Sequence, residues 1–475
     1  MNGLPHTDPT VASLVPDLAG FADPVSDSGN DQPQQNVTPD PLPQQNQSII
    51  EPLILPDATE PCSDFISSYV TYADRLELPP IMHELTALTG IAALVNGKIT
   101  IKNGGQRVSL DIWTLLISSS GGGRNTLASL FRECLRSCGL ASLVSTESWG
   151  SGMAMQESFA KCPDAKLHVW EEMSAMMLKF QQRDFQGALE WLTNLYDNFE
   201  IPPAVRYRAG KGSKPGKPGS NKTPDIVFTA PPRTNLLSLT SEAWFLDKTS
   251  EIQAKGGFTP RWCPLIVREP GRFIATPAEA DASLLVPMTK KLRLIEGCRG
   301  EMRVEGALQK EYQKWYEQMK RRFMAQPNAG LAEVFANRHR VHFLKLWALY
   351  EVSLSASLNL SKASFDRAVA MCRRIEETIL TLLKTGFTSE GAESYSLEER
   401  ILATGATGLS QTELCSSYRG GKFRDVKDRV SMLLSSGLIE CFERKPTGRG
   451  RPARFYVHRD HLDQHEKQFP DDKRA

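Results

Sequence analysis

The chain lacks the features of a secreted or membrane-spanning protein. Its nine cysteines are scattered over 475 residues without a C-x-x-C pair, so neither a zinc cluster nor a disulfide framework is predicted. The N-terminus has no basic segment followed by an apolar run, which argues against a secretory signal. The most apolar stretch, residues 81–95, contains His83 and Glu84 and is too short to cross a bilayer. We therefore expect a cytoplasmic protein without a membrane partner.

Lys and Arg are absent from the first sixty positions, which contain nine Asp and Glu. The rest of the chain therefore holds 56 basic and 55 − 9 = 46 acidic residues, a net charge of +10 that suits an anionic partner. Residues 1–60 are rich in Pro, Gln and Ser, and such a segment buries too little apolar surface to offset its ordering entropy. We predict a disordered acidic tail. It could recruit a partner, mask a basic groove or be passive, and we favour the last.

A glycine-rich turn lies between an apolar run and an amphipathic stretch in residues 111–135. The apolar run 112–117 is short enough for a buried strand, and Leu127, Leu130, Phe131 and Leu135 recur at helical spacing. Such a turn lets backbone N–H groups converge on phosphate, helped by the partial positive charge of the helix N-terminus. The predicted phosphate-binding residues are Ser120, Gly121, Gly122, Gly123, Arg124, Asn125 and Thr126.

This turn departs from the usual pattern G-x-x-x-x-G-K-[ST] at three positions. Ser118 replaces the first glycine, Arg124 the lysine, and Asn125 the magnesium-binding hydroxyl. Arginine still neutralises phosphate, as a planar fork rather than a point charge. Asn125 offers magnesium a carbonyl oxygen, and Thr126 offers a hydroxyl if the loop shifts register. The predicted cofactors are ATP and Mg²⁺, and the alternative is an ordinary strand-to-helix turn.

A second informative stretch, Leu167–Glu172, is an apolar run that ends in two acidic residues. In P-loop ATPases such a strand faces the phosphate loop, its first acid holding magnesium and its second orienting the attacking water. Glu171 and Glu172 are therefore predicted catalytic residues, and Glu171 also a metal ligand. A core strand that ends in two acids before a helix explains the pattern as well. Its position, about forty residues after the turn, suits a parallel crossover.

Residues 206–222 contain six basic residues, four glycines and no acid. Proline and glycine oppose regular structure here, so a mobile cationic loop is predicted, followed by an apolar strand at 226–228. In hexameric helicases of related design, a comparable loop holds the nucleic-acid backbone in a central channel. A solvated surface insertion is an equal alternative. The predicted nucleic-acid contacts are Arg206, Arg208, Lys211, Lys214, Lys217 and Lys222.

The sequence G-G-F-T-P-R at 256–261 precedes another apolar strand at 265–267. An arginine on a rigid turn can reach the γ-phosphate of a neighbouring subunit and stabilise charge in the transition state. Arg261 is therefore a predicted catalytic residue of an oligomer. A surface arginine in a Gly/Pro turn is the alternative.

The predicted organisation is an α/β protein with a parallel sheet: a helical lead-in with a hairpin (61–110), a core (111–281), a helical lid (282–388), a winged helix-turn-helix (389–460) and a charged tail (461–475). The S-x-x-E sequences at Ser396 and Ser410 predict helix starts. A third helix contains Phe423, Val426, Val430, Leu433 and Leu434, which we expect inside, and a basic hairpin follows. Such a domain binds DNA or docks proteins, and we favour DNA. The predicted contacts are Lys422, Arg424, Lys427, Arg449, Arg451 and Arg454.

With these motifs in order, residues 61–385 resemble the primase-helicase-like P-loop proteins of prophages, plasmids and genomic islands, the YfjI-like group. The shared features are P-P-x-x-H-x-L from Pro79, the glycine-rich turn, the acidic strand end, G-G-F-x-x-R, and R-x-x-x-L-K-L from Arg340 to Leu346. The resemblance implies an oligomeric RecA/AAA-like ATPase core that acts on DNA during replication of a mobile element. The alternative is a catalytically inactive P-loop fold that regulates or initiates replication through its winged helix.

Overall fold

The computed structural model describes residues 64–119, 123–145, 147–161, 166–196, 198–205, 225–248, 257–268, 272–326, 328–387, 389–416, 423–445 and 452–475. The predicted acidic tail, the centre of the glycine-rich turn, the basic loop 206–222 and the tip of the C-terminal hairpin lie outside these ranges. The chain divides into two compact units, Met1–Pro56 and Asp57–Ala475, and all described residues belong to the second. No helix in the described ranges has the length and apolar character needed to cross a membrane.

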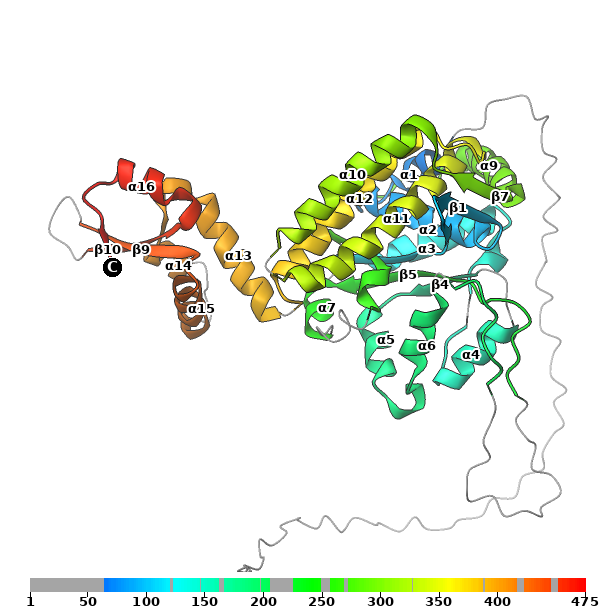
Figure 1. Cartoon of the computed structure of the whole chain (residues 1–475), viewed down its shortest axis with the longest axis horizontal. Coiled ribbons are helices and arrows are strands. Elements are labelled where there is room, and N and C mark those ends of the chain that lie inside the picture. Colours follow the sequence, from blue (N-terminus) through cyan, green and yellow to red (C-terminus); the bar gives the residue numbers. More distant parts are fainter. Residues whose placement is uncertain are drawn as a thin grey trace, which may run out of the picture. The chain divides into compact units, whose positions relative to one another are not determined.

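A four-stranded parallel sheet forms the centre of the larger part of the molecule (Figure 1). Its strands are β3 (Trp113–Ser118), β4 (Lys166–Trp170), β5 (Thr234–Ser241) and β6 (Trp262–Val267). They lie in the order β4-β5-β3-β6, so the strand before the glycine-rich turn is central. Val144, which belongs to no strand, forms an isolated parallel bridge with Leu167 of β4. The predicted parallel sheet is confirmed, and its uninterrupted apolar strands reflect burial on both faces.

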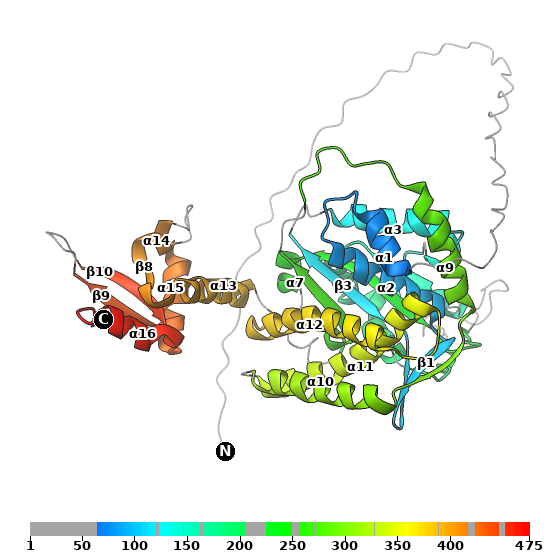
Figure 2. The same cartoon turned by 90° about the horizontal axis from the view of Figure 1, so that it is seen from above.

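Helices cover both faces of this sheet. On one face lies α2 (Pro80–Val95), where the Oγ1 atoms of Thr89 and Thr114 are 2.6 Å apart. On the other face lies α5 (Met173–Phe180), where the hydroxyls of Ser174 and Thr240 are 3.0 Å apart. Strand side chains alternate between faces, which makes these two contacts opposite. Beside α2 lie α1 (Phe65–Ala73), α3 (Arg124–Ser137) and α9 (Leu285–Gly297) (Figure 2). Three more helices in the described residues follow or precede strands of this sheet, α4 (Gly152–Lys161), α6 (Ala188–Leu195) and α7 (Glu242–Lys248).

A smaller sheet adjoins the first. Strands β1 (Ile99–Asn103) and β2 (Gln106–Ser109) form the predicted hairpin, which is confirmed, and β7 (Gly300–Arg303) joins β1 in parallel. The strand predicted at 226–228 is wrong: Ile226 makes only an isolated antiparallel bridge with Val205. The strand of the main sheet begins eight residues later than Ile226, at Thr234.

The predicted helical lid, residues 282–388, contains α9 and then the strand β7, so the all-helical prediction is wrong there. Three long helices follow, α10 (Gly306–Met324), α11 (Ala329–Ser355) and α12 (Lys362–Lys384). One continuous hydrophobic core extends from Phe65 to Phe387, so lead-in, sheet and lid are joined by the same buried side chains. Lys345 of α11 is fully buried, and its Nζ donates to the backbone oxygen of Asp111 at 2.7 Å. It therefore has a structural role and does not reach the carboxyl ends of the strands.

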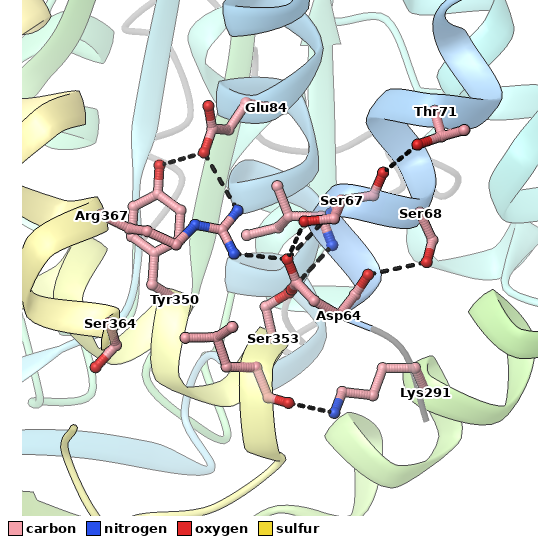
Figure 3. A network of polar contacts seen from close by, with 12 residues as sticks. Asp64, Ser67, Ser68, Thr71, Glu84, Lys291, Tyr350, Ser353, Ser364 and Arg367 are labelled. Atoms are coloured by element: carbon pink, nitrogen blue, oxygen red, sulfur yellow. Dashed lines mark hydrogen bonds and ion pairs between the residues drawn. The ribbon is translucent and has the colours of Figure 1, made fainter. Parts of the chain in front are cut away.

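A polar network fixes the start of α1 against α11 and α12 (Figure 3). Asp64 caps α1 and accepts hydrogen bonds from Ser353 and, at 2.6 Å, from Nη1 of Arg367. The other end of the Arg367 guanidinium contacts Glu84 at 3.3 Å, and the Tyr350 hydroxyl donates to the same carboxylate at 2.8 Å. Each charge in this half-buried cluster has an opposite partner, which offsets its loss of hydration.

The C-terminal part has its own hydrophobic core, from Leu397 to Tyr456. Its elements are α13 (Ser389–Ala403), β8 (Leu409–Ser410), α14 (Gln411–Ser416), α15 (Phe423–Ser435), β9 (Ile439–Arg444), β10 (Ala453–His458), α16 (Leu462–Gln468) and β11 (Lys473–Arg474). The sheet order is β11-β9-β10-β8, all antiparallel. The capping box at Ser410 and Glu413 is confirmed. Ser396 lies inside α13, so the helix start predicted there is wrong.

Two further expectations for this part differ from the structure. Leu434 is 36% exposed, whereas Val426, Val430 and Leu433 are buried as expected, because Leu434 lies outside the stripe that these three residues share. The residues expected to form a charged tail, 461–475, contain α16 and β11, and β11 pairs with the outer edge of β9. Arg444 of β9 fixes the segment between α16 and β11. Its Nε donates to the Asp472 carboxylate at 2.9 Å, and its guanidinium carbon lies 3.8 Å from the ring centre of Phe469.

Candidate functional site

The carboxyl ends of the parallel strands meet at one edge of the main sheet, where α/β proteins bind ligands. From the central strand β3 the chain passes to Gly123, which has φ +68° and directly precedes α3. This left-handed backbone favours glycine. Arg124 begins the helix, and its Nη1 is buried without a hydrogen-bond partner among the described residues. Asn125 and Thr126, in the first turn of α3, have exposed side chains. Ser120, Gly121 and Gly122 lie outside the described ranges.

Glu172 lies at the same edge, just after β4. It caps α5, and its Oε1 accepts a hydrogen bond of 2.6 Å from Oγ1 of Thr240. Thr240 belongs to β5, the strand between β4 and β3, and pairs in register with Ile117. Oε2 of Glu172 accepts no hydrogen bond from the described residues and is available to a ligand. Sequence reasoning found Glu172 but missed Thr240.

Glu171 points elsewhere. Its carboxylate is 2.6 Å from Nη1 of Arg132 on α3, and both side chains are partly exposed. These two residues and Glu172 line a cleft of about 620 Å³ between α3, β4 and α5, which Arg136, Trp149 and Lys179 also line. The predicted role of Glu171 as a metal ligand therefore requires the Arg132 ion pair to open.

A further ion pair crosses the end of β3. Glu242 follows β5 and Arg268 follows β6, and these strands pair with β3 on either side, Ser241 and Val267 both opposite Ser118. The guanidinium of Arg268 binds the Glu242 carboxylate through two hydrogen bonds, of 3.1 Å from Nε and 2.5 Å from Nη2. The only sequence signal for this pair was a charged residue directly after each apolar strand.

Arg261 lies at the opposite edge of the sheet. It ends a short turn before β6, and its Nη1 donates to the carbonyl of Gly257. Trp262, the next residue, pairs with Trp113 at the start of β3. Arg261 is thus distant from Glu172 within one chain. The described residues that flank the basic loop, Val205 and Ile226, precede β5 at this same edge and exchange hydrogen bonds of 2.9 and 3.0 Å.

Few of the predicted nucleic-acid contacts lie within the described residues. Lys427 is exposed on α15 beside the exposed Asp428, and Arg454 of β10 is 3.2 Å from the Glu443 carboxylate. Arg429 of α15 is largely buried and pairs with Glu393 of α13. The side chains of Lys422, Arg424, Arg449 and Arg451, and the loop residues Arg206 to Lys222, lie outside the described ranges.

The carboxyl edge thus brings together a helix N-terminus, the cation Arg124 and the carboxylate of Glu172. Such a set can hold a polyanion at the helix and a water molecule at the carboxylate. No model of a known protein family matches the chain, and no curated protein matches it either.

Proposed function

We propose that the chain binds a nucleoside triphosphate at the turn between β3 and α3 and hydrolyses it in association with DNA, as the helicase-like P-loop proteins of mobile elements do. The observation that carries this proposal is the position of Glu172 on the same sheet edge as the start of α3. One strand, β5, separates β4 from β3, so these two features are about 10 Å apart, two strand spacings. That gap suits a terminal phosphoryl group and an attacking water.

The residues around the turn fit the phosphates. The N–H groups of the first turn of α3 provide hydrogen-bond donors, and so does Nη1 of Arg124, which has no partner among the described residues. The left-handed Gly123 lets the backbone approach closely. Arg268 lies after the adjacent strand and adds a second cation, which Glu242 orients. Ser120, Gly121 and Gly122 would complete the cradle.

Oxygen donors near the start of α3 fit Mg²⁺, a hard cation that is commonly shared between a few side chains and substrate phosphates. Asn125 and Thr126 would hold it, with Glu171 added once its contact with Arg132 opens. Oε2 of Glu172 is then left for the water. When bound, the ion supplies Lewis-acid stabilisation of charge on the phosphoryl oxygens. Glu172, oriented by Thr240, positions the water and accepts its proton.

The C-terminal part supports a DNA partner. Three helices, α13, α14 and α15, and the hairpin β9–β10 follow one another as in a winged helix, with β8 as the short strand between the first two helices. In this proposal α15 enters the major groove and the hairpin tip with Arg449 and Arg451 grips phosphate. Arg261 would complete the site of a neighbouring subunit in an oligomer.

Hydrolysis of ATP, with and without DNA, tests the enzymatic proposal. Glu172→Gln keeps the hydrogen bond from Thr240 but removes the base, so we expect turnover to fall about 10²- to 10⁴-fold. The matched control is Glu190→Gln, which changes an exposed glutamate of α6 outside the cleft lining and should leave turnover unchanged. Equal rates for the parent and Glu172→Gln would reject the catalytic assignment.

A second candidate function is a DNA-binding regulator with an inactive phosphate loop. The residues that favour it are Arg124 and Asn125, where the usual pattern has Lys and Ser or Thr. The double substitution Arg124→Lys with Asn125→Ser distinguishes the two. Hydrolysis that arises only in the double variant would indicate an inactive natural loop, and a similar rate in both proteins would indicate an active one.

A further inference from the structure

The outer face of the sheet β2-β1-β7 carries a row of cations that the proposed function does not use. Lys102 of β1 pairs in register with Arg107 of β2 on one side and Arg303 of β7 on the other. Register partners share a face of a sheet. The neighbouring row, from Ile101 to its partners in β2 and β7, is buried in the core, so the cationic row faces outward.

Like charges directly opposite each other weaken a sheet, so this row has an energetic cost unless an anion covers it. Arg303 is the only member with a carboxylate partner among the described residues, Glu301 at 3.0 Å. Arg107 is exposed, and its Nε donates to the hydroxyl of Thr100 at 3.2 Å. Lys102 and Arg107 therefore remain uncompensated cations in the part of the chain that the structure describes.

An aromatic ring extends the row. The guanidinium carbons of Arg107 and Arg233 lie 5.6 and 5.3 Å from the ring centre of Phe199, which is 38% exposed. Nη1 of Arg233 donates to the carbonyl of Asn198 at 2.9 Å, which fixes this side chain. Burial lowers the pKa of Arg233, Asp111 opposes this effect, and the nearby charge of Arg107 adds to it. The positive charges of Arg107 and Arg233 are thus both held close to the ring of Phe199.

This surface is continuous in the chain with the basic loop. Phe199 lies six residues before Val205 and Arg233 seven residues after Ile226, the two residues whose bridge closes the base of residues 206–224. Ile201 and Val227, near the same base, are 52% and 59% exposed.

We propose that Lys102, Arg107, Phe199 and Arg233 form a binding surface for single-stranded nucleic acid. The cations hold successive phosphates, and the ring with its two guanidinium planes supports a base. An exposed aromatic surface among cations favours a single strand over a duplex, whose bases are stacked on one another. The proposal deepens the DNA association proposed above by naming the strand type and the contact residues, and it does not require ATP hydrolysis.

Fluorescence anisotropy of a labelled oligo-dT, with the full chain, tests it. Phe199→Leu retains an apolar side chain but removes the ring, and we expect binding about tenfold weaker, within the range for loss of one stacked base. Arg107→Gln should lower the slope of log affinity against log salt by about 0.7, as for one phosphate contact on a single strand. The control is Phe273→Leu, which changes a phenylalanine that is 93% exposed after β6, at the other edge of the sheet.

The outcomes separate this inference from the proposed function. Weaker binding in Phe199→Leu and Arg107→Gln, with the Phe273→Leu protein like the parent, supports the surface whether or not ATP is hydrolysed. Parent-like affinity and salt slope in both variants would overturn it, even in an active ATPase. Competition by poly-glutamate as effective as that by oligo-dT at equal charge would also overturn it, in favour of an acidic protein partner.

Discussion

Asp64 is a residue at which burial and hydrogen bonding act in opposite directions. Burial raises its pKa, but hydrogen bonds from Ser353, Ser67 and Arg367 outweigh this effect and hold the pKa below 3.8. A carboxyl with a lowered pKa in the folded state stabilises the fold above its unfolded pKa. The stabilisation is therefore complete at pH 6 and is lost as the pH falls from about 4 through the lower folded value.

The substitution Asp64→Asn tests this residue. We expect it to lower the free energy of unfolding by about 1–3 kcal/mol at pH 6, because it removes a charged acceptor and leaves Arg367 with only Glu84. The deficit should shrink at pH 3, where Asp64 itself begins to protonate. Urea unfolding of parent and variant at both pH values measures it, and a deficit of equal size at both would contradict the assignment.

At the same scale, the candidate site was predictable only in part. Glu171, Glu172 and the turn before Arg124 follow local patterns, because a short apolar run next to glycines or acids marks the end of a strand. Thr240 carries no such mark, and the charge of Arg268 after an apolar run does not indicate which strands lie beside it. Both residues reach the site because β5 and β6 flank β3, and strand order is a long-range property that spacing along the chain does not contain.

Among the elements, helix α11 contains a buried histidine that makes the stability of the fold depend on pH. His339 is buried on this helix, and burial, with the charge of Arg322, lowers its pKa to about 3. An unfolded histidine titrates near 6.5. The neutral form therefore stabilises the fold above about pH 6.5, and this stabilisation is lost as the pH falls. Between pH 7 and pH 5 the loss for one such histidine is about 2 kcal/mol.

Replacement of His339 by leucine should remove that loss. Between pH 7 and pH 5 the free energy of unfolding should fall in both proteins, but the fall should be about 2 kcal/mol smaller in His339→Leu than in the parent. This expectation does not depend on the stability of the variant at pH 7. The control Asn337→Ala changes an exposed residue of the same helix and should keep the pH dependence of the parent. Chemical unfolding at both pH values measures the difference, and identical slopes in parent and His339→Leu would count against it.

Elements were predictable where the local pattern was strong. The hairpin β1–β2 and the long helices follow from glycine at a turn and from helical spacing. Strand β5 was missed because the strand after the basic loop was assigned to the shorter apolar run at 226–228. Pro231 and Pro232 oppose strand pairing, so regular structure begins only at Thr234. The start of α13 was placed too late, since an S-x-x-E sequence occurs inside helices as well as at their ends.

For the whole molecule, the two hydrophobic cores divide the described residues at about position 388. All eight tryptophans lie before this position, so tryptophan fluorescence reports on the first core alone, whereas circular dichroism reports on both.

Leu433 is buried in the second core, and Leu433→Ala should destabilise it by about 2–5 kcal/mol. In a urea titration we expect this variant to lose part of its helical signal early, with the fluorescence midpoint unchanged. The matched variant Leu346→Ala, in the first core, should move the fluorescence midpoint instead. A fluorescence midpoint that shifts in Leu433→Ala as much as in Leu346→Ala would mean that the two cores unfold as one cooperative unit, because the free energy lost in one would then be felt in the other.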